Sequence, residues 1–116
     1  PSGGEQRWRV LGHVALADAV MDFAVAAVME RRRPEGLRST FHIERAIAKI
    51  RRGLDGLAKK TKRGEFHMGS IATAVALEYL DYRHADINWR DEHGALAAWL
   101  DAVAQRHAFQ STRPQP

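Results

Sequence analysis

The feature that most constrains this 116-residue chain is an apolar run of ten residues from Met68 to Leu77. Its side chains carry oxygen only at Ser70 and Thr73, and both hydroxyls can hydrogen-bond to carbonyl groups of their own helix. Ten residues are too few to span a bilayer, which takes about 20. A helix that is apolar on nearly all sides is stable in water only when other helices cover it. The run therefore predicts an all-α bundle with a central buried helix over about residues 67–83.

Two long stretches before this run predict an antiparallel helical hairpin. The first is helical from about residue 5 to residue 32, where Pro34 and Gly36 follow and stop it. The second begins near residues 38 to 40 and runs to about residue 60. Its large aliphatic residues recur at spacings of 4, 3, 4 and 3 on one face: Ile43, Ile47, Ile50, Leu54 and Leu57. Because the connecting loop is short, the two helices form an αα-hairpin, in which Gly53 and Gly56 permit a close crossing.

A fourth helix is predicted from about residue 91 or 93 to residue 106. Its apolar stripe follows the spacing i, i+3, i+4 and i+7: Leu96, Trp99, Leu100 and Val103. The segment 85–93 is expected to be an ordered loop, because it holds Ile87 and Trp89, two side chains that favour burial. Residues 1–116 then form one all-α domain, a helical bundle of four main helices plus a short C-terminal segment.

Cysteine is absent, which excludes disulfides, a thiolate nucleophile and thiolate metal sites. The first residues lack the charged, apolar and small-residue regions of a signal peptide, and the chain opens without methionine. We therefore expect a cytoplasmic protein, and we expect these residues to be a fragment of a longer chain.

The net charge of +4 is unevenly distributed along the chain. Residues 1–63 hold 14 Lys/Arg and 7 Asp/Glu, whereas residues 64–116 hold 4 and 7. A basic half is compatible with a nucleic-acid partner. However, the arginines at 31–33 and the lysines at 59–62 fall at helix ends, where cations stabilise the helix dipole, and no aromatic residues alternate with them to stack on bases. Nucleic-acid binding is therefore the less favoured interpretation.

The polar residues form no catalytic constellation in the sequence. The six histidines include no pair at spacing i, i+4 and no H-E-x-x-H motif, so no metal site is expected, and solvated or helix-capping histidines are expected instead. Gly3 and Gly4 lack the preceding strand of a phosphate-binding loop. Ser39, Ser70 and Ser111 carry no local nucleophile motif. We therefore assign no catalytic residue to this chain.

Two aspartates interrupt the most apolar part of the first helix. From Val14 to Met29 only Asp18 and Asp22 carry charge, which argues against a membrane span. Their spacing of four puts both on one helical face. A carboxylate among alanines and valines is costly unless it reaches water or a cation. A solvated face explains Asp22 as readily as a function does, whereas Asp18 lies among more apolar neighbours and is the stronger functional candidate.

The order and spacing of several segments resemble the C-terminal helical domain of bacterial-type cytosolic glutathione S-transferases. The resemblance is densest in F-H-M-G-S-I-A-T-A-V-A-L-E-Y-L-D-Y-R, D-I-N-W-R, H-G-A-L-A-A-W and R-H-A-F-Q-S-T-R-P. The earlier segments A-L-A-D and E-R-R-R-P-E fit the same pattern. The resemblance therefore covers almost the whole chain. One departure falls at the start of the central helix, where the family has a Ser/Thr and Asp capping box and this chain has His67 and Ser70.

The resemblance implies a role in attack of a glutathione thiolate on a hydrophobic electrophile, a detoxification reaction. In that family a thioredoxin-like N-terminal domain, absent from these residues, binds glutathione and activates its thiol. These 116 residues alone are therefore not expected to be catalytic, and glutathione is a co-substrate rather than a bound cofactor. The resemblance also implies a homodimer formed through the first two helices. Two alternatives stay open: a non-catalytic protein-interaction module of the same fold, and the basic nucleic-acid-binding domain considered above.

The same resemblance supplies candidate binding residues. An acidic residue near Asp18 in related enzymes faces the γ-glutamyl ammonium of glutathione held by the neighbouring subunit. Asp22 would then line the co-substrate pocket with three apolar neighbours on the first helix: Leu11, Val14 and Met21. His67 and Ser70 are expected to supply part of the cap of the central helix.

Overall fold

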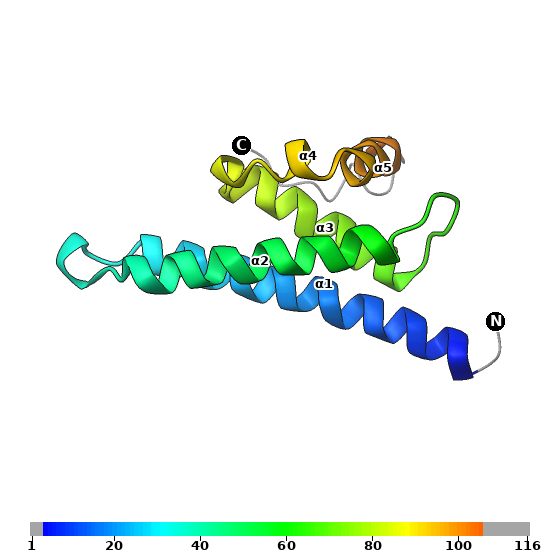
Figure 1. Cartoon of the computed structure of the whole chain (residues 1–116), viewed down its shortest axis with the longest axis horizontal. Helices are drawn as coiled ribbons and strands as arrows, with labels where there is room; N and C mark the ends of the chain where they lie inside the picture. The colour runs from blue at the N-terminus through cyan, green and yellow to red at the C-terminus, as the bar shows by residue number, and fades with distance from the viewer. Residues whose placement is uncertain (1–3, 106–116) are drawn as a thin grey trace.

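A computed structural model of the chain describes residues 4–105, which form an all-helical bundle. Its helices are α1 (Gly4–Arg31), α2 (Thr40–Lys60), α3 (Met68–Arg83), α4 (Trp89–Glu92) and α5 (Gly94–Ala104). Two 3-10 turns are η1 (Glu35–Leu37) and η2 (Ala85–Ile87). α1 and α2 run antiparallel, α3 packs on α1, and α4 and α5 lie beyond α3 (Figure 1). The all-α fold and the hairpin are confirmed, and the predicted C-terminal segment lies outside the described residues.

The turn between α1 and α2 is fixed by a carboxylate at the end of α1. Glu30 accepts a hydrogen bond of 2.9 Å from the backbone N–H of Ser39, and that bond, aided by the nearby Arg33, lowers the pKa of the Glu30 carboxyl. Ser39 in turn caps α2 by accepting from the backbone N–H of His42. One side chain therefore links the end of the first helix to the cap of the second.

The two long helices approach closely where α2 carries glycine. A Cβ atom on Gly53 would lie 2.4 Å from Cγ2 of Val20, and one on Gly56 would lie 2.7 Å from Cδ2 of Leu16. Both distances are far below van der Waals contact. The sequence prediction of a close crossing at these two glycines is therefore confirmed.

α3 is the centre of the bundle, but it is not covered on nearly all sides. Leu77 and Leu80 are fully buried against the core, whereas Ile71 and Val75 are 45% and 44% exposed. The exposed positions form one helical face, which we call the α3 apolar face: Met68, Ile71, Val75 and Tyr82. The prediction of a fully covered helix is wrong here because α1, η2 and α5 contact the other sides of α3, and no described helix packs on this one.

The predicted fourth helix is present as α5, and the segment before it, expected to be an ordered loop, contains η2 and the short helix α4. Asn88, at φ 55°, takes the left-handed conformation between η2 and α4, and the chain leaves helical geometry again at His93 before α5 begins. The expectation that Ile87 and Trp89 are buried is confirmed. The Trp89 indole N–H donates to Asp81 at 2.9 Å, and the Arg90 guanidinium both pairs with Asp81 at 2.7 Å and lies over the indole ring.

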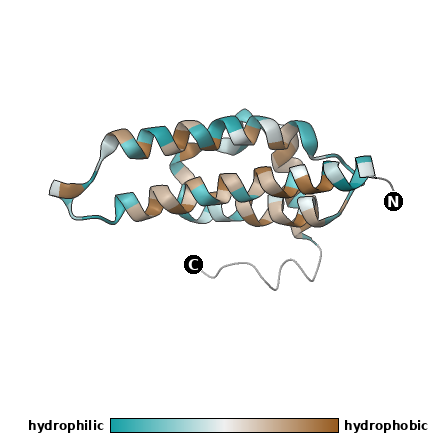
Figure 2. Ribbon diagram, turned by 90° about the horizontal axis from the view of Figure 1, so that it is seen from below, coloured by the Kyte–Doolittle hydropathy of each residue, from teal (hydrophilic) through white to brown (hydrophobic). Residues whose placement is uncertain are grey.

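Among the described helices, α1 is long and apolar enough to cross a membrane, judged by length and composition alone. Its apolar residues have another explanation, since its buried positions pack against α2 and α3. Hydrophilic and hydrophobic segments alternate along both helices of the hairpin (Figure 2). Asp18 and Asp22 lie exposed in the middle of α1. These features are those of a helix in a bundle.

Candidate functional site

The residues predicted to bind glutathione and a co-substrate lie on one face of α1. Leu11, Asp18 and Asp22 are exposed, and Val14 and Met21 are half-buried beside them. Their spacings of three and four residues keep them together along the helix. The structure therefore brings the five candidates onto a common surface, although they do not enclose a cavity by themselves.

Neither carboxylate on this face has a partner among the residues that the structure describes. Within residues 4–105, Asp18 and Asp22 form no hydrogen bond or ion pair, and both are exposed. Because both carboxylates are exposed, water solvates them despite their apolar neighbours. Two unpaired carboxylates one helical turn apart can also receive a cationic group from another molecule.

The carboxylates lie in the middle of a longer exposed stripe, which we call the α1 seam. Its members alternate at spacings of three and four: Trp8, Leu11, Ala15, Asp18, Asp22, Val25 and Met29. Trp8 is 72% exposed and Met29 is 62% exposed. A stripe with large apolar ends and an acidic centre is typical of a surface that meets another protein surface or a ligand.

A row of cations on α2 lies next to α1. We call it the α2 basic row; it consists of Arg45, Lys49 and Arg52. It flanks two shallow hollows of about 310 and 320 Å³ between α1 and α2, with Phe23 lining both. The Lys49 ammonium lies 4.9 Å from the centre of the Phe23 ring, within the range of a cation–π interaction.

The start of α3 is capped by His67 and Ser70, which stand where the resemblance leads one to expect a Ser/Thr and Asp capping box. Nδ1 of His67 accepts from the backbone N–H of Gly69 at 3.0 Å. Oγ of Ser70 accepts from the backbone N–H of His67 at 3.2 Å. Both residues therefore satisfy N–H groups that would otherwise lack partners at this helix end.

Two buried histidines connect α1 to the ends of α3, contrary to the expectation that the histidines are solvated or only cap helices. His13, only 3% exposed, places Nε2 2.9 Å from Oγ1 of Thr73 and 3.2 Å from Oγ1 of Thr61. His84, fully buried, places Nε2 2.8 Å from the carbonyl oxygen of Ala24. The burial of His13 could have been predicted from its position, because it lies four residues before Ala17 and so on the same, core-facing side of α1.

The environment of His13 disfavours its charged form. Burial is the main cause that lowers the pKa of the His13 imidazole, and the positive charges of His67 and Lys60 lower it further, while Glu65 opposes them. A neutral ring avoids a buried charge, and its Nε2–H can still donate toward the hydroxyl oxygens.

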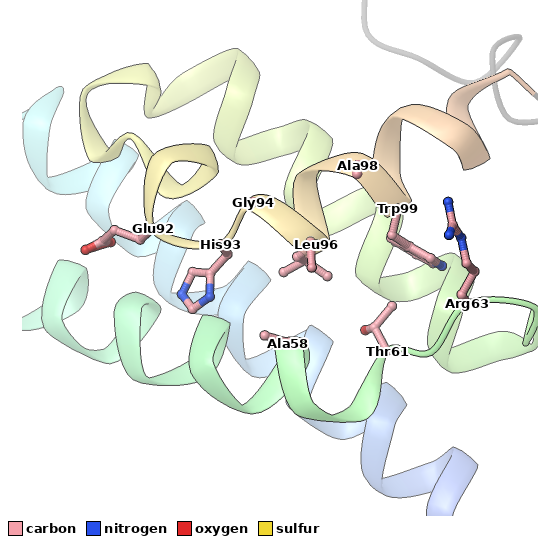
Figure 3. A pocket seen from close by; sticks show the side chains of 10 residues that line it. Ala58, Thr61, Arg63, Glu92, His93, Gly94, Leu96, Ala98 and Trp99 are labelled. Atoms are coloured by element: carbon pink, nitrogen blue, oxygen red, sulfur yellow. The ribbon is translucent and has the colours of Figure 1, made fainter.

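The largest hollow described lies elsewhere, between the end of α2 and the start of α5 (Figure 3). It has a volume of about 490 Å³, and Thr61, His93 and Trp99 are among the residues that line it. Nε2 of His93 lies 3.2 Å from Oδ1 of Asp55, so this histidine has a structural partner. Within residues 4–105 no group of three His, Cys, Asp or Glu residues is placed to hold a metal ion. The residues that line this hollow therefore form no recognisable catalytic or metal-binding group, and none of the predicted site residues lines it.

Comparison with known proteins places this helical bundle in a family. The family model of the glutathione S-transferase C-terminal domain matches residues 40–102. An Escherichia coli K12 relative, "Uncharacterized GST-like protein YibF", is 30% identical over 105 residues, which cover 86% of this chain and 52% of that protein.

Solved structures of two bacterial glutathione transferases extend the match. One from Pseudomonas fluorescens Pf-5, with bound S-(propanoic acid)-glutathione, is 37% identical with a TM-score of 0.94, and covers 100% of this chain and 62% of that one. One from Methylobacillus flagellatus KT, with glutathione bound, is 33% identical with a TM-score of 0.88, and covers 99% of this chain and 60% of that one. This chain thus spans less than two thirds of the length of each relative, and it belongs to the glutathione S-transferase C-terminal domain family.

Proposed function

We propose that this chain is the helical domain of a cytoplasmic enzyme that catalyses attack of the glutathione thiolate on hydrophobic electrophiles. The observation that carries the proposal is the match of the whole chain, at a TM-score of 0.94, to a transferase with a glutathione conjugate bound. In this assignment the chain supplies a wall of the co-substrate pocket and a subunit interface. The thiol is activated by a part of the protein outside these residues.

The length of the relatives supports this division of labour. Each of them extends well beyond the region matched here. The described residues hold no arrangement that would deprotonate a thiol. A thioredoxin-like domain, as expected from the family, would supply that chemistry. The α3 apolar face is a suitable surface for such a domain, since it is a contiguous apolar patch that no described helix covers.

The α1 seam gives the helical domain a binding role in the reaction. In a dimer, the Asp18 carboxylate would accept charge-assisted hydrogen bonds from the γ-glutamyl ammonium of glutathione held by the other subunit. Asp22 would lie at the edge of the co-substrate pocket, with Leu11, Val14 and Met21 as its apolar wall. The exposure of Asp18 and its lack of a partner within residues 4–105 support this role, because a carboxylate already paired within its own chain would bind an ammonium less well.

The hairpin of α1 and α2 is the proposed dimer interface. A two-fold axis pairs a surface with its own copy, so the surface must be self-complementary. The α1 seam is acidic at its centre, and the α2 basic row lines hollows whose α1 residues lie outside the seam. Placing the basic row of one subunit near the acidic centre of the other avoids juxtaposed carboxylates and attracts opposite charges. The exposed Trp8, Val25 and Met29 would add apolar contact area.

Catalysis by the full-length protein tests this assignment. We expect the full-length protein to conjugate glutathione to an aromatic halide and residues 1–116 alone to show only the uncatalysed rate, because residues 4–105 hold no arrangement that would activate a thiol. A spectrophotometric assay of both proteins at equal concentration is sufficient. Turnover by residues 1–116 would show that the reactive site is misplaced. A full-length protein that binds other proteins but neither binds nor conjugates glutathione would favour the interaction-module alternative.

A further inference from the structure

Three helices meet at the side chain of His13. The ring lies on α1, Thr61 follows the last residue of α2, and Thr73 lies one turn into α3. The Thr73 hydroxyl donates its proton to the carbonyl oxygen of Gly69 at 2.7 Å, so toward His13 its oxygen can only accept. Nε2 of His13 must therefore carry the proton, and in the neutral ring Nδ1 is bare.

A second histidine lies beside this junction, and its own hydrogen bond needs an unprotonated nitrogen. His67 contacts His13 edge to face, with ring centroids 5.3 Å apart. Its Nδ1 accepts from the backbone N–H of Gly69, the bond that caps α3. A proton on that nitrogen would remove the acceptor and break the cap. The start of α3 is therefore held by His67, whose cap bond needs an unprotonated Nδ1, and by His13, whose protonation would place a charge in a buried position.

The packing leaves the rings little room to adapt. A Cβ atom on Gly69 would lie 2.6 Å from Cγ and 2.8 Å from Nδ1 of His13, so the ring lies directly on the backbone of α3. Both rings nevertheless line a hollow of about 190 Å³ that opens to solvent, through which protons reach them. The junction is thus tightly packed but accessible to acid.

The charges around the junction are predominantly positive. α1 contributes Arg9, α2 contributes Lys59 and Lys60, and the following loop contributes Lys62 and Glu65, besides His67 at the start of α3. Arg9 already pairs with Glu65, at 3.7 Å. An added proton on the His13 ring therefore meets more repulsion than attraction.

We propose that His13 and His67 form a pH-sensitive latch, which holds the start of α3 against α1 and α2 at neutral pH and releases it in acid. Protonation of His13 adds a buried charge at the three-helix junction, and protonation of His67 removes the α3 cap. Both changes act on the same first turn of α3. This device is separate from the transferase assignment and does not depend on it.

The direction of the pH dependence follows from the His13 environment. Because burial and neighbouring positive charges lower the pKa of His13 in the folded chain, the unfolded chain takes up the proton first as the pH falls. The contribution of the neutral ring is fully present above the ordinary histidine pKa of about 6.5. It is lost progressively as the pH falls from there toward the lower pKa of the folded state.

Urea unfolding of residues 1–116 at pH 7.5 and pH 5.0 tests the latch. We expect the folding equilibrium constant of the wild type to fall several-fold more than that of His13→Gln, which keeps an amide N–H near the position of Nε2 but does not titrate. His67→Asn keeps a cap acceptor and is expected to reduce the pH dependence further when combined with His13→Gln. The exposed His42→Gln is the matched control and should behave as wild type. Equal losses in wild type and in the double variant would overturn the proposal.

A second measurement on the wild type alone keeps the proposal testable should His13→Gln fail to fold. Amide hydrogen exchange by NMR should accelerate first at Gly69 and Ser70 as the His13 and His67 rings titrate, before the rest of α3 opens. Protonation of both rings without faster exchange at these two amides would contradict a latch at this position.

Discussion

Asp18→Asn is expected to weaken glutathione binding by the full-length dimer about ten-fold or more. The change removes a charge and keeps the shape, and the side chain is exposed and without a partner within residues 4–105, so the fold should be unaffected. A hydrogen bond to a charged group contributes about 1.5–3 kcal/mol, and about 1.4 kcal/mol corresponds to a factor of ten in the dissociation constant. Calorimetric titration with glutathione measures the difference.

Asp22→Asn is the matched control for this prediction. It removes an identical charge from the same face, one helical turn away, and should change the affinity for glutathione less than Asp18→Asn does. A general electrostatic effect of the α1 seam would instead weaken binding equally in both variants. Equal affinity of Asp18→Asn and the wild type would make Asp18 an ordinary solvated residue.

Trp89→Ala is expected to lower the free energy of unfolding by about 3–5 kcal/mol, the usual cost of deleting a large buried aromatic side chain. Trp89 is only 2% exposed, and it also donates to Asp81 and lies beneath the Arg90 guanidinium. A domain of this size has a total stability of about 5–15 kcal/mol, so the variant should be close to unfolding at physiological temperature. Urea unfolding of residues 1–116 measures the change.

Trp89→Phe separates packing from hydrogen bonding at this site. Phenylalanine keeps most of the buried ring but not the indole N–H, so we expect a smaller loss than for alanine. Asp81 would keep its ion pair with Arg90, which raises the pKa of that guanidinium and still satisfies the carboxylate. A loss below about 1 kcal/mol for Trp89→Ala would mean that α4 contributes little to the core.

The helices could be predicted from the sequence because their apolar residues recur at helical spacing. The end of α1 follows from Pro34, the extent of α2 from the periodicity of its isoleucines and leucines, and the position of α3 from its apolar run. The exposure of Ile71 and Val75 could not be predicted in this way, because an apolar pattern shows which residues favour burial and not how many neighbours are present to cover them. The start of α4 depends on the left-handed backbone of Asn88, and the break between α4 and α5 depends on the non-helical backbone of His93; no periodicity reports either conformation.

The candidate site, too, could be predicted from the sequence only in part. The common face of Asp18 and Asp22 follows from their spacing alone. The role of His13 does not, because its partners Thr61 and Thr73 are 48 and 60 residues away in the chain. Only the packing of three helices brings these side chains together.

A crystal structure of the full-length protein with glutathione is the most direct test of the proposed role of α1. We expect one glutathione in each subunit, with its γ-glutamyl ammonium within about 3.2 Å of the Asp18 carboxylate from the other subunit. Glutathione bound with Asp18 of both subunits facing only solvent would contradict the account.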